Sequence, residues 1–60
     1  MNAYTLIVDT VVGYDYDGDQ EKARAAAEKK VPNRAEIVKE QRIVIGTIAV
    51  SVLVIVKEGA

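Results

Sequence analysis

The sequence predicts an α+β fold, with one short alanine-rich helix packed on a mainly antiparallel sheet and the element order β-α-β-β. Three observations support this prediction. Two segments are rich in Val, Ile and Thr, residues that suit the pleated, half-buried surface of a strand. An alanine-rich segment of high helix propensity lies between them. A Gly-Thr pair inside the C-terminal segment offers a place for the chain to reverse.

The first strand is predicted over Tyr4–Tyr14. Because successive side chains of a strand alternate between its two faces, the even-numbered residues share one face and the odd-numbered residues the other. Neither face is clearly polar. Gly13, near the end of the segment, predicts a bulge or a close approach of another part of the backbone.

An acidic, turn-rich segment, Asp15–Asp19, follows the first strand and supplies the start of the helix. A capping box pairs the N-cap side chain with a polar residue three positions later. Asp17 with Gln20 fits this pattern, and Gly18 with Glu21 is a second register. Both registers predict a helix that begins at the end of the acidic turn.

The helix is predicted over Gln20–Lys30. Arg24 and Glu28 have the spacing of a stabilising i,i+4 pair. Pro32 stops the helix, because the residue before a proline is disfavoured in the α region. The apolar face is mostly alanine, so the helix can lie close to a sheet but covers little area. The alanines on that face are Ala23, Ala26 and Ala27.

The segment Arg34–Ile45 has two interpretations. Asn33 followed by Glu36 could cap a second helix, but the apolar residues that follow do not recur at the helical spacing. A strand fits better, and a helix over Arg34–Gln41 remains the alternative. One face of the strand would carry Ile37, Lys39, Gln41, Ile43 and Ile45.

The run Ile43–Val56 contains no charged residue. It is shorter than the roughly 20 apolar residues that a membrane-spanning helix needs, so no membrane contact is predicted. Gly46 and Thr47 divide it, and both faces of the strand that follows are largely apolar. One face is β-branched throughout and carries Ile48, Val50, Val52, Val54 and Val56. The other face carries Ala49, Ser51, Leu53 and Ile55.

Two apolar sheet faces and one narrow helix predict that the protein associates with itself. A 60-residue chain makes a marginal core, and without Cys or His it has no disulfide or imidazole metal site to compensate. We therefore expect a single domain over residues 1–60 whose second sheet face is buried by another copy, through stacked sheets or paired edges. A monomer with a tight core is the alternative. The predicted interface residues are Ile48, Val50, Val52, Leu53, Val54, Ile55 and Val56.

Composition limits the possible partners. Eight basic and nine acidic residues give a net charge of −1, which does not favour nucleic-acid binding. The N-terminus does not resemble a signal peptide, and the absence of cysteine gives no sign of an oxidising compartment. We expect a soluble, cytoplasmic homo-oligomer.

The expected function is that of a small non-enzymatic protein-interaction module, an adaptor or inhibitor, that acts through the sheet surface or the turn at Tyr14–Asp19. The alternative is an oligomer that binds a small ligand in pockets between subunits. Tyrosine is enriched at protein interfaces, which makes the turn a candidate contact. The candidate contact residues are Tyr14, Asp15, Tyr16, Asp17 and Asp19.

The residues that could carry other chemistry do not form a known pattern. Alternate aspartates in the turn match the first ligand positions of a calcium loop, but the twelfth position is Ala26, so no metal site is predicted. Ser51 lies in an apolar strand. Asp9 would be a candidate functional carboxylate only if it were buried among its apolar neighbours. No catalytic residue is predicted.

The order strand, helix, strand, strand is similar to that of dodecins, which are small flavin-binding shells. The chain has no Trp that could stack on a flavin, and its predicted helix and final hairpin loop are shorter. The similarity is one of element order alone, and no cofactor is predicted.

Overall fold

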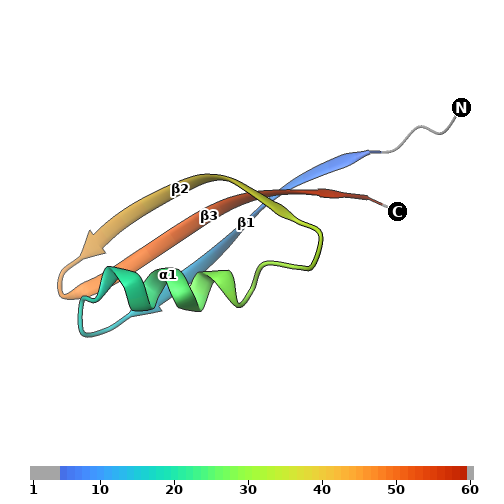
Figure 1. The fold of residues 1–60 in the computed structure, drawn as a ribbon. Coiled ribbons are helices and arrows are strands. Elements are labelled where there is room, and N and C mark those ends of the chain that lie inside the picture. The colour runs from blue at the N-terminus through green and yellow to red at the C-terminus, as the bar shows by residue number, and fades with distance from the viewer. Residues whose placement is uncertain (1–4, 60) are drawn as a thin grey trace, which may run out of the picture.

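The computed structural model describes residues 5–59 and has the predicted β-α-β-β order. Its elements are β1 (Leu6–Asp15), α1 (Gln20–Glu28), β2 (Glu36–Ile45) and β3 (Ile48–Glu58). The strands form one antiparallel sheet in the order β1-β3-β2 (Figure 1). The strand interpretation of the third element is thus confirmed. The first residue of the predicted first strand, Tyr4, lies outside the described residues.

The central position of β3 explains why both of its faces are apolar. Residues Ala49–Val56 of β3 have neighbours on both β1 and β2, and paired residues of an antiparallel sheet present their side chains on the same face. Leu53 pairs with Val11 on one side, whereas Val54 pairs with Thr10. The odd-numbered and even-numbered residues of β3 therefore lie on opposite faces, as the alternation predicts.

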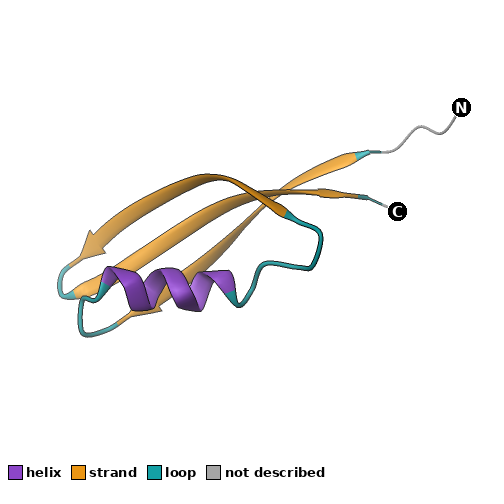
Figure 2. Ribbon diagram, in the orientation of Figure 1, coloured by secondary structure: helices purple, strands orange, loops and turns teal. Residues whose placement is uncertain are grey.

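The helix α1 lies across β1 and β3 on one face of the sheet (Figure 2). The buried core sits between them and contains Ala27, Leu53 and Ile55. Gly13 allows the close contact, because a Cβ there would collide with backbone atoms of α1 and would lie 2.9 Å from the Cα of Ala27. The predicted close approach at this glycine is confirmed.

The helix begins at a different cap from the two that the sequence predicts. Asp19 is the N-cap, and its Oδ1 accepts hydrogen bonds from the backbone N–H groups of Glu21 at 3.0 Å and Lys22 at 3.2 Å. The predicted capping boxes at Asp17 and Gly18 are wrong.

The reason for this cap lies in the turn before it. The backbone oxygen of Asp15 accepts a hydrogen bond from Gly18, and its Oδ2 accepts one from the N–H of Asp19 at 2.8 Å. Gly18 has a φ of 80°, and Asp19 follows in an extended conformation. The turn therefore delivers Asp19, and not Asp17, to the N-cap position.

The helix also ends earlier than the predicted Lys30. After the C-cap at Lys29 the backbone continues in shorter turns, with Lys30 N–H bonded to Ala27 and Val31 N–H bonded to Glu28. Such i→i+3 bonds commonly tighten the end of an α-helix.

The strand β2 contains a bulge that changes which residues share a face. Ile37 pairs with Ile55, but Lys39 pairs with Val54, so the register shifts at Val38. A bulge places one extra residue against the partner strand. Ile37 consequently lies on the α1 side, and its predicted position beside Lys39 is wrong. The hairpin to β3 turns at Gly46, as predicted, with a φ of 60°.

Candidate interaction surface

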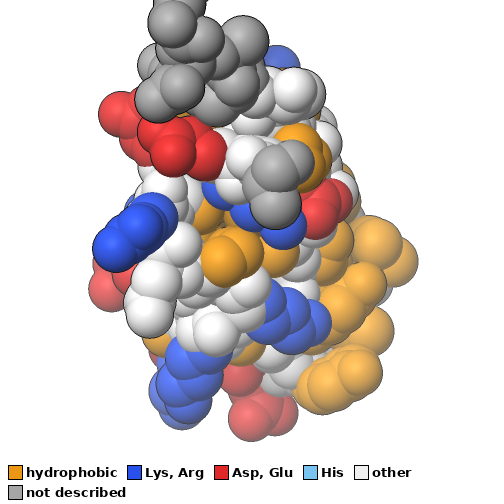
Figure 3. Space-filling model, turned by 90° about the vertical axis from the view of Figure 1, so that its right-hand side faces the viewer, with side chains coloured by type: hydrophobic (Ala, Val, Ile, Leu, Met, Phe, Trp, Pro, Cys, Tyr) orange, Lys and Arg blue, Asp and Glu red, His pale blue; other side chains and the backbone are white. Residues whose placement is uncertain are grey.

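The sheet face opposite α1, called the open face below, carries apolar side chains from all three strands and is not covered by α1. Figure 3 shows hydrophobic side chains gathered along one flank of the molecule, at the right of the view. From β1 the open face receives Leu6, Val8, Thr10, Val12 and Tyr14. From β3 it receives Ile48, Val50, Val52, Val54, Val56 and, at the end of the strand, Glu58. From β2 it receives Glu36, Lys39, Gln41, Ile43 and Ile45.

The three strands place these residues in rows across the sheet, and the polar ones gather along one margin. Rows near the hairpin are apolar from strand to strand, as in the row Tyr14, Val50 and Ile43. Farther from the hairpin, the β2 position of each row is polar. The open face therefore has an apolar area over β1 and β3 and a polar margin along part of β2. The polar margin consists of Glu36, Lys39 and Gln41.

Several large apolar side chains on the open face are strongly exposed in the single chain. The exposed fraction is 67% for Val8 and 61% for Ile45, and Leu6 and Tyr14 are also exposed. Scattered exposed apolar residues are normal, but a contiguous patch marks a site of contact with another molecule. Because apolar residues of β3 lie beside them in the rows of the sheet, these exposed residues belong to one contiguous apolar patch.

The structure divides the seven predicted interface residues between the two faces. Leu53 and Ile55 have no exposed surface, because they lie in the core under α1. The other five lie on the open face. The sequence prediction did not include the β1 residues beside them, although the alternation already grouped the even-numbered positions of that strand. The five are Ile48, Val50, Val52, Val54 and Val56.

The outer edges of the sheet carry groups that hinder pairing with another strand. At the edge of β1, Lys30 Nζ donates a hydrogen bond to the backbone oxygen of Val12 at 2.6 Å, and Asp9 Oδ1 accepts one from the N–H of Thr10 at 2.8 Å. At the edge of β2 lies the bulge at Val38. Charged side chains and bulges are common devices against edge-to-edge association.

The acidic turn supplies one exposed aromatic residue. Tyr14 belongs to the open face, whereas Tyr16 projects from the turn with 73% of its surface exposed. The side-chain oxygens of Asp15 and Asp19 accept backbone hydrogen bonds, within the turn and at the helix N-terminus respectively. Within residues 5–59 no group of three acidic side chains is close enough together to hold a metal ion. Asp9 is exposed, and its Oδ2 lies 4.0 Å from Lys57 Nζ.

A polar seam joins α1 to β2, where the apolar core does not reach. Arg24 forms ion pairs with Glu28 and with Glu40, and Glu40 also lies 3.4 Å from the guanidinium of Arg42. Gln20 Nε2 donates a hydrogen bond to the backbone oxygen of Ile43 at 3.0 Å. The sequence indicated only the Arg24–Glu28 pair, since the other contacts depend on the position of β2.

Beneath the helix, Ser51 is fully buried, and its hydroxyl has no hydrogen-bond partner among the described residues. This buried position separates the hydroxyl from any ligand in solution.

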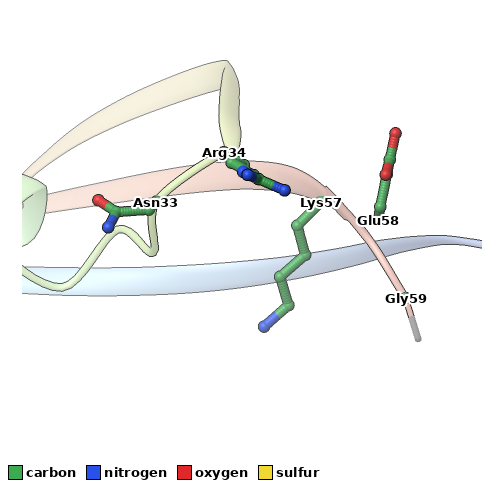
Figure 4. A pocket seen from close by; sticks show the side chains of 5 residues that line it. All are labelled: Asn33, Arg34, Lys57, Glu58 and Gly59. Atoms are coloured by element: carbon green, nitrogen blue, oxygen red, sulfur yellow. The ribbon is translucent and has the colours of Figure 1, made fainter.

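An open pocket of about 290 Å³ lies at the end of the sheet away from the hairpin. The side chains of Arg34, Lys57 and Glu58 at this pocket point in different directions (Figure 4). Ligand sites usually hold a few polar groups that converge on one point. This pocket does not have that arrangement.

No protein-family model matches the chain, and no curated protein or solved structure matches it. In residues 5–59 no helix has both the length and the apolar character that crossing a bilayer requires.

Proposed function

We propose that the protein is a small self-assembling interaction module, and that the open face packs against the open face of a second copy. The observation that supports the proposal is the contiguous apolar surface over β1 and β3, which α1 leaves uncovered because it lies on the other side of the sheet. Burial of that surface would add a second core to a chain whose own core is small.

The size of the open face suits an interface between two copies. Strands of about ten residues, spaced about 4.8 Å apart, make a face of roughly 14 by 33 Å, or about 450 Å² per copy. Two such faces approach the roughly 1,000 Å² at which specific protein interfaces begin. Side chains that interdigitate between sheets about 10 Å apart increase this area.

The need for a second core follows from the contents of the first. Among residues 5–59 the largest fully buried side chains are Leu53, Ile55 and Ser51. Small domains usually need added stabilisation from a disulfide, a metal ion or a partner chain. The chain contains no cysteine and no histidine, so a partner chain is the source of stabilisation that we propose.

The state of the strand edges favours stacked sheets over paired edges as the mode of contact. Lys30 and Asp9 occupy backbone groups of β1, and the bulge at Val38 interrupts β2. Between the rows of Ile48 and Val56 the open face carries no comparable obstruction over β1 and β3, since its charged residues are Glu36 and Lys39 along the margin on β2 and Glu58 at the end of β3.

The end of the molecule that carries the acidic turn is proposed as the contact for another protein. Tyr16 is strongly exposed, and two hydrogen bonds to Asp15 hold the turn from which it projects. A rigid, exposed aromatic ring with a polar tip is typical of residues that anchor interfaces.

Val52→Lys tests self-assembly at the centre of the open face. The lysine cannot be buried unpaired between two sheets, so we expect the mass measured by light scattering after size exclusion to fall to that of one chain, 6.5 kDa. Ala25→Lys, on the exposed side of α1, is the matched control and should leave the mass unchanged.

A second variant separates loss of assembly from loss of folding. Thr10 is exposed in the single chain and lies on the open face beside Val54, so Thr10→Lys should preserve the circular-dichroism spectrum and still reduce the mass. If the unaltered protein is a monomer at micromolar concentration, the proposal is refuted. Native mass spectrometry of the purified assembly addresses the alternative function, because a retained small molecule at fixed stoichiometry would favour ligand binding.

A further inference from the structure

We infer that the outer edge of β2 is a second contact between copies of this chain, separate from the open face. The two β2 strands pair antiparallel about a two-fold axis perpendicular to the sheet, with Gln41 opposite Gln41 of the second copy. The two sheets then form one continuous sheet with both α1 helices on the same side. The open faces stay free in this pairing, so the edge contact does not depend on the stacking of open faces.

The edge of β2 is the freer of the two sheet edges. At the β1 edge, Lys30 donates a hydrogen bond to the backbone oxygen of Val12. The bulge at Val38 obstructs only the start of the β2 edge, and residues 39–45 beyond it pair regularly with β3. Among residues 5–59 the only side chain that forms a hydrogen bond with the backbone of this stretch is Gln20, at the oxygen of Ile43.

The hairpin shows which backbone groups of β2 point outward. Gly46 has a φ of 60°, whereas the φ of Thr47 is not positive, which is the pattern of a two-residue type II′ turn. Ile45 and Ile48 flank this turn and exchange backbone hydrogen bonds. Bonded and non-bonded pairs alternate along antiparallel strands, so Ile43 also faces β3 and its bond to Gln20 leaves the outer edge free. The residues whose backbone groups point outward are Glu40, Arg42 and Val44.

The charges on this edge select one register. Outward groups must meet outward groups, which limits antiparallel self-pairing to registers centred on a single residue. A centre at Glu40 or at Arg42 would place like charges directly opposite each other, which is destabilising. A centre at Ile43 would set Arg42 against Val44 and bring no opposite charges together. A centre at Gln41 pairs Glu40 with Arg42 of the second copy, and symmetry forms the same pair again.

The register centred on Gln41 also suits the side chains that the single chain leaves exposed. The side chain of Arg42 is 55% exposed and lies 3.4 Å from Glu40 of its own chain, so the pair with the second copy extends an existing group of charges. Val44 is 68% exposed and falls opposite Val38 of the second copy, which is exposed as well. The two Gln41 amides meet on the axis. The edge is therefore complementary to itself in backbone groups, charge and apolar side chains.

This contact is much smaller than the open face. It consists of a few backbone hydrogen bonds and of partly exposed ion pairs, each of which adds little. Contacts of such size are weak and transient. Copies whose open face is blocked therefore stay single at micromolar concentration and pair only briefly through β2, whereas copies stacked by their open faces can be joined further by their edges.

A disulfide across the two-fold axis traps the brief pairing. The chain has no cysteine, so Gln41→Cys supplies one thiol per copy. Opposite residues of a non-bonded pair have Cα atoms about 4.5 Å apart, which a disulfide can span. In protein that also carries Thr10→Lys to block the open face, we expect oxidation to give the mass of two chains on a non-reducing gel.

Ile43→Cys in the same Thr10→Lys protein is the matched control. In the inferred register its Cα atoms lie about 14 Å apart, so we expect Gln41→Cys to cross-link about tenfold faster or more. Adding Arg42→Glu places a carboxylate opposite Glu40 of the second copy, and cross-linking of Gln41→Cys should then fall to the rate of the control. Circular dichroism checks that each variant is folded.

The outcomes separate this inference from the proposed function. Equal rates for Gln41→Cys and Ile43→Cys would refute the edge pairing, and a faster rate for Ile43→Cys would overturn the register. Because these variants carry a blocked open face, stacking does not affect either result. If the unaltered protein is a monomer at micromolar concentration while Gln41→Cys still cross-links faster, the open-face proposal fails and the edge contact stands.

Discussion

The two faces of β3 have similar hydrophobicity and different surroundings. On the α1 side, Leu53 and Ile55 have no exposed surface, whereas on the open face Val52 and Val54 remain partly exposed. On the open face Val50 is buried, because Tyr14 and Ile43 flank it in its row. Apolar character is therefore not what separates the faces. The difference is that one face has a cover within the chain and the other does not.

The largest expected effect concerns the cover of the first face. Gly13→Val would place a branched side chain against the backbone of α1, which cannot move aside as a flexible side chain can. We expect α1 to separate from the sheet, with a loss of about 3 kcal/mol or more in the free energy of unfolding, measured by urea denaturation. Such a loss is a large part of the roughly 3–9 kcal/mol of unfolding free energy expected for a domain of this length.

Gly46→Ala is the matched control for this variant. A Cβ at Gly46 meets nothing within 4 Å, so only its φ of 60° opposes the change. The expected cost is about 1 kcal/mol, from the strain of a left-handed alanine. Equal effects of the two variants would show that the close contact at Gly13 is not what holds α1 to the sheet.

Neighbouring residues on the two faces provide the next comparison. Leu53→Ala removes a side chain from the covered core, and we expect a loss of about 2–5 kcal/mol in unfolding free energy. Val54→Ala, on the open face, should cost about 1 kcal/mol or less in the fold but should raise the dissociation constant of the dimer roughly tenfold. Denaturation and sedimentation equilibrium measure the two quantities. If Val54→Ala left the dissociation constant unchanged, the open face would not be the interface.

The elements of the fold were predictable because each depends on neighbours along the chain. The alternation of apolar residues gave both faces of β3, the alanine-rich segment gave α1, and Gly13 gave the close contact. The bulge at Val38 was not predictable, since nothing in that residue differs from an ordinary strand residue. It exists only in the pairing with β3.

The candidate surface was predictable only in part, because it depends on contacts between segments that are distant in the sequence. Both faces of β3 could be recognised as apolar, but which of them α1 covers depends on the path of the chain after β1. The sequence therefore could not separate Leu53 and Ile55 from their neighbours. The helix cap is a similar case, because the sequence indicated Asp17 or Gly18, whereas the hydrogen bond from the N–H of Asp19 to Asp15 places Asp19 at the N-cap position.

The polar seam between α1 and β2 completes the covered face without apolar contacts. Glu40→Gln keeps the shape of the side chain and removes the carboxylate that meets Arg24 and Arg42. We expect a loss of about 1–2 kcal/mol in unfolding free energy, a weaker dependence of stability on salt, and an unchanged dimer dissociation constant. Glu28→Gln is the control and should cost less than about 0.5 kcal/mol, since this carboxylate is half exposed.

The smallest expected effect concerns the start of the helix that covers the first face. Asp19→Ala removes the oxygen that accepts hydrogen bonds from Glu21 and Lys22, and loss of such a cap typically costs about 1 kcal/mol. Asp17→Ala is the matched control, and it should change the free energy of unfolding by less than about 0.5 kcal/mol. Thermal denaturation of the two variants at one protein concentration measures the difference. A larger effect at Asp17 would return the cap to the position that the sequence alone indicated, whereas the expected order would show that the turn at Asp15 sets where the covering helix begins.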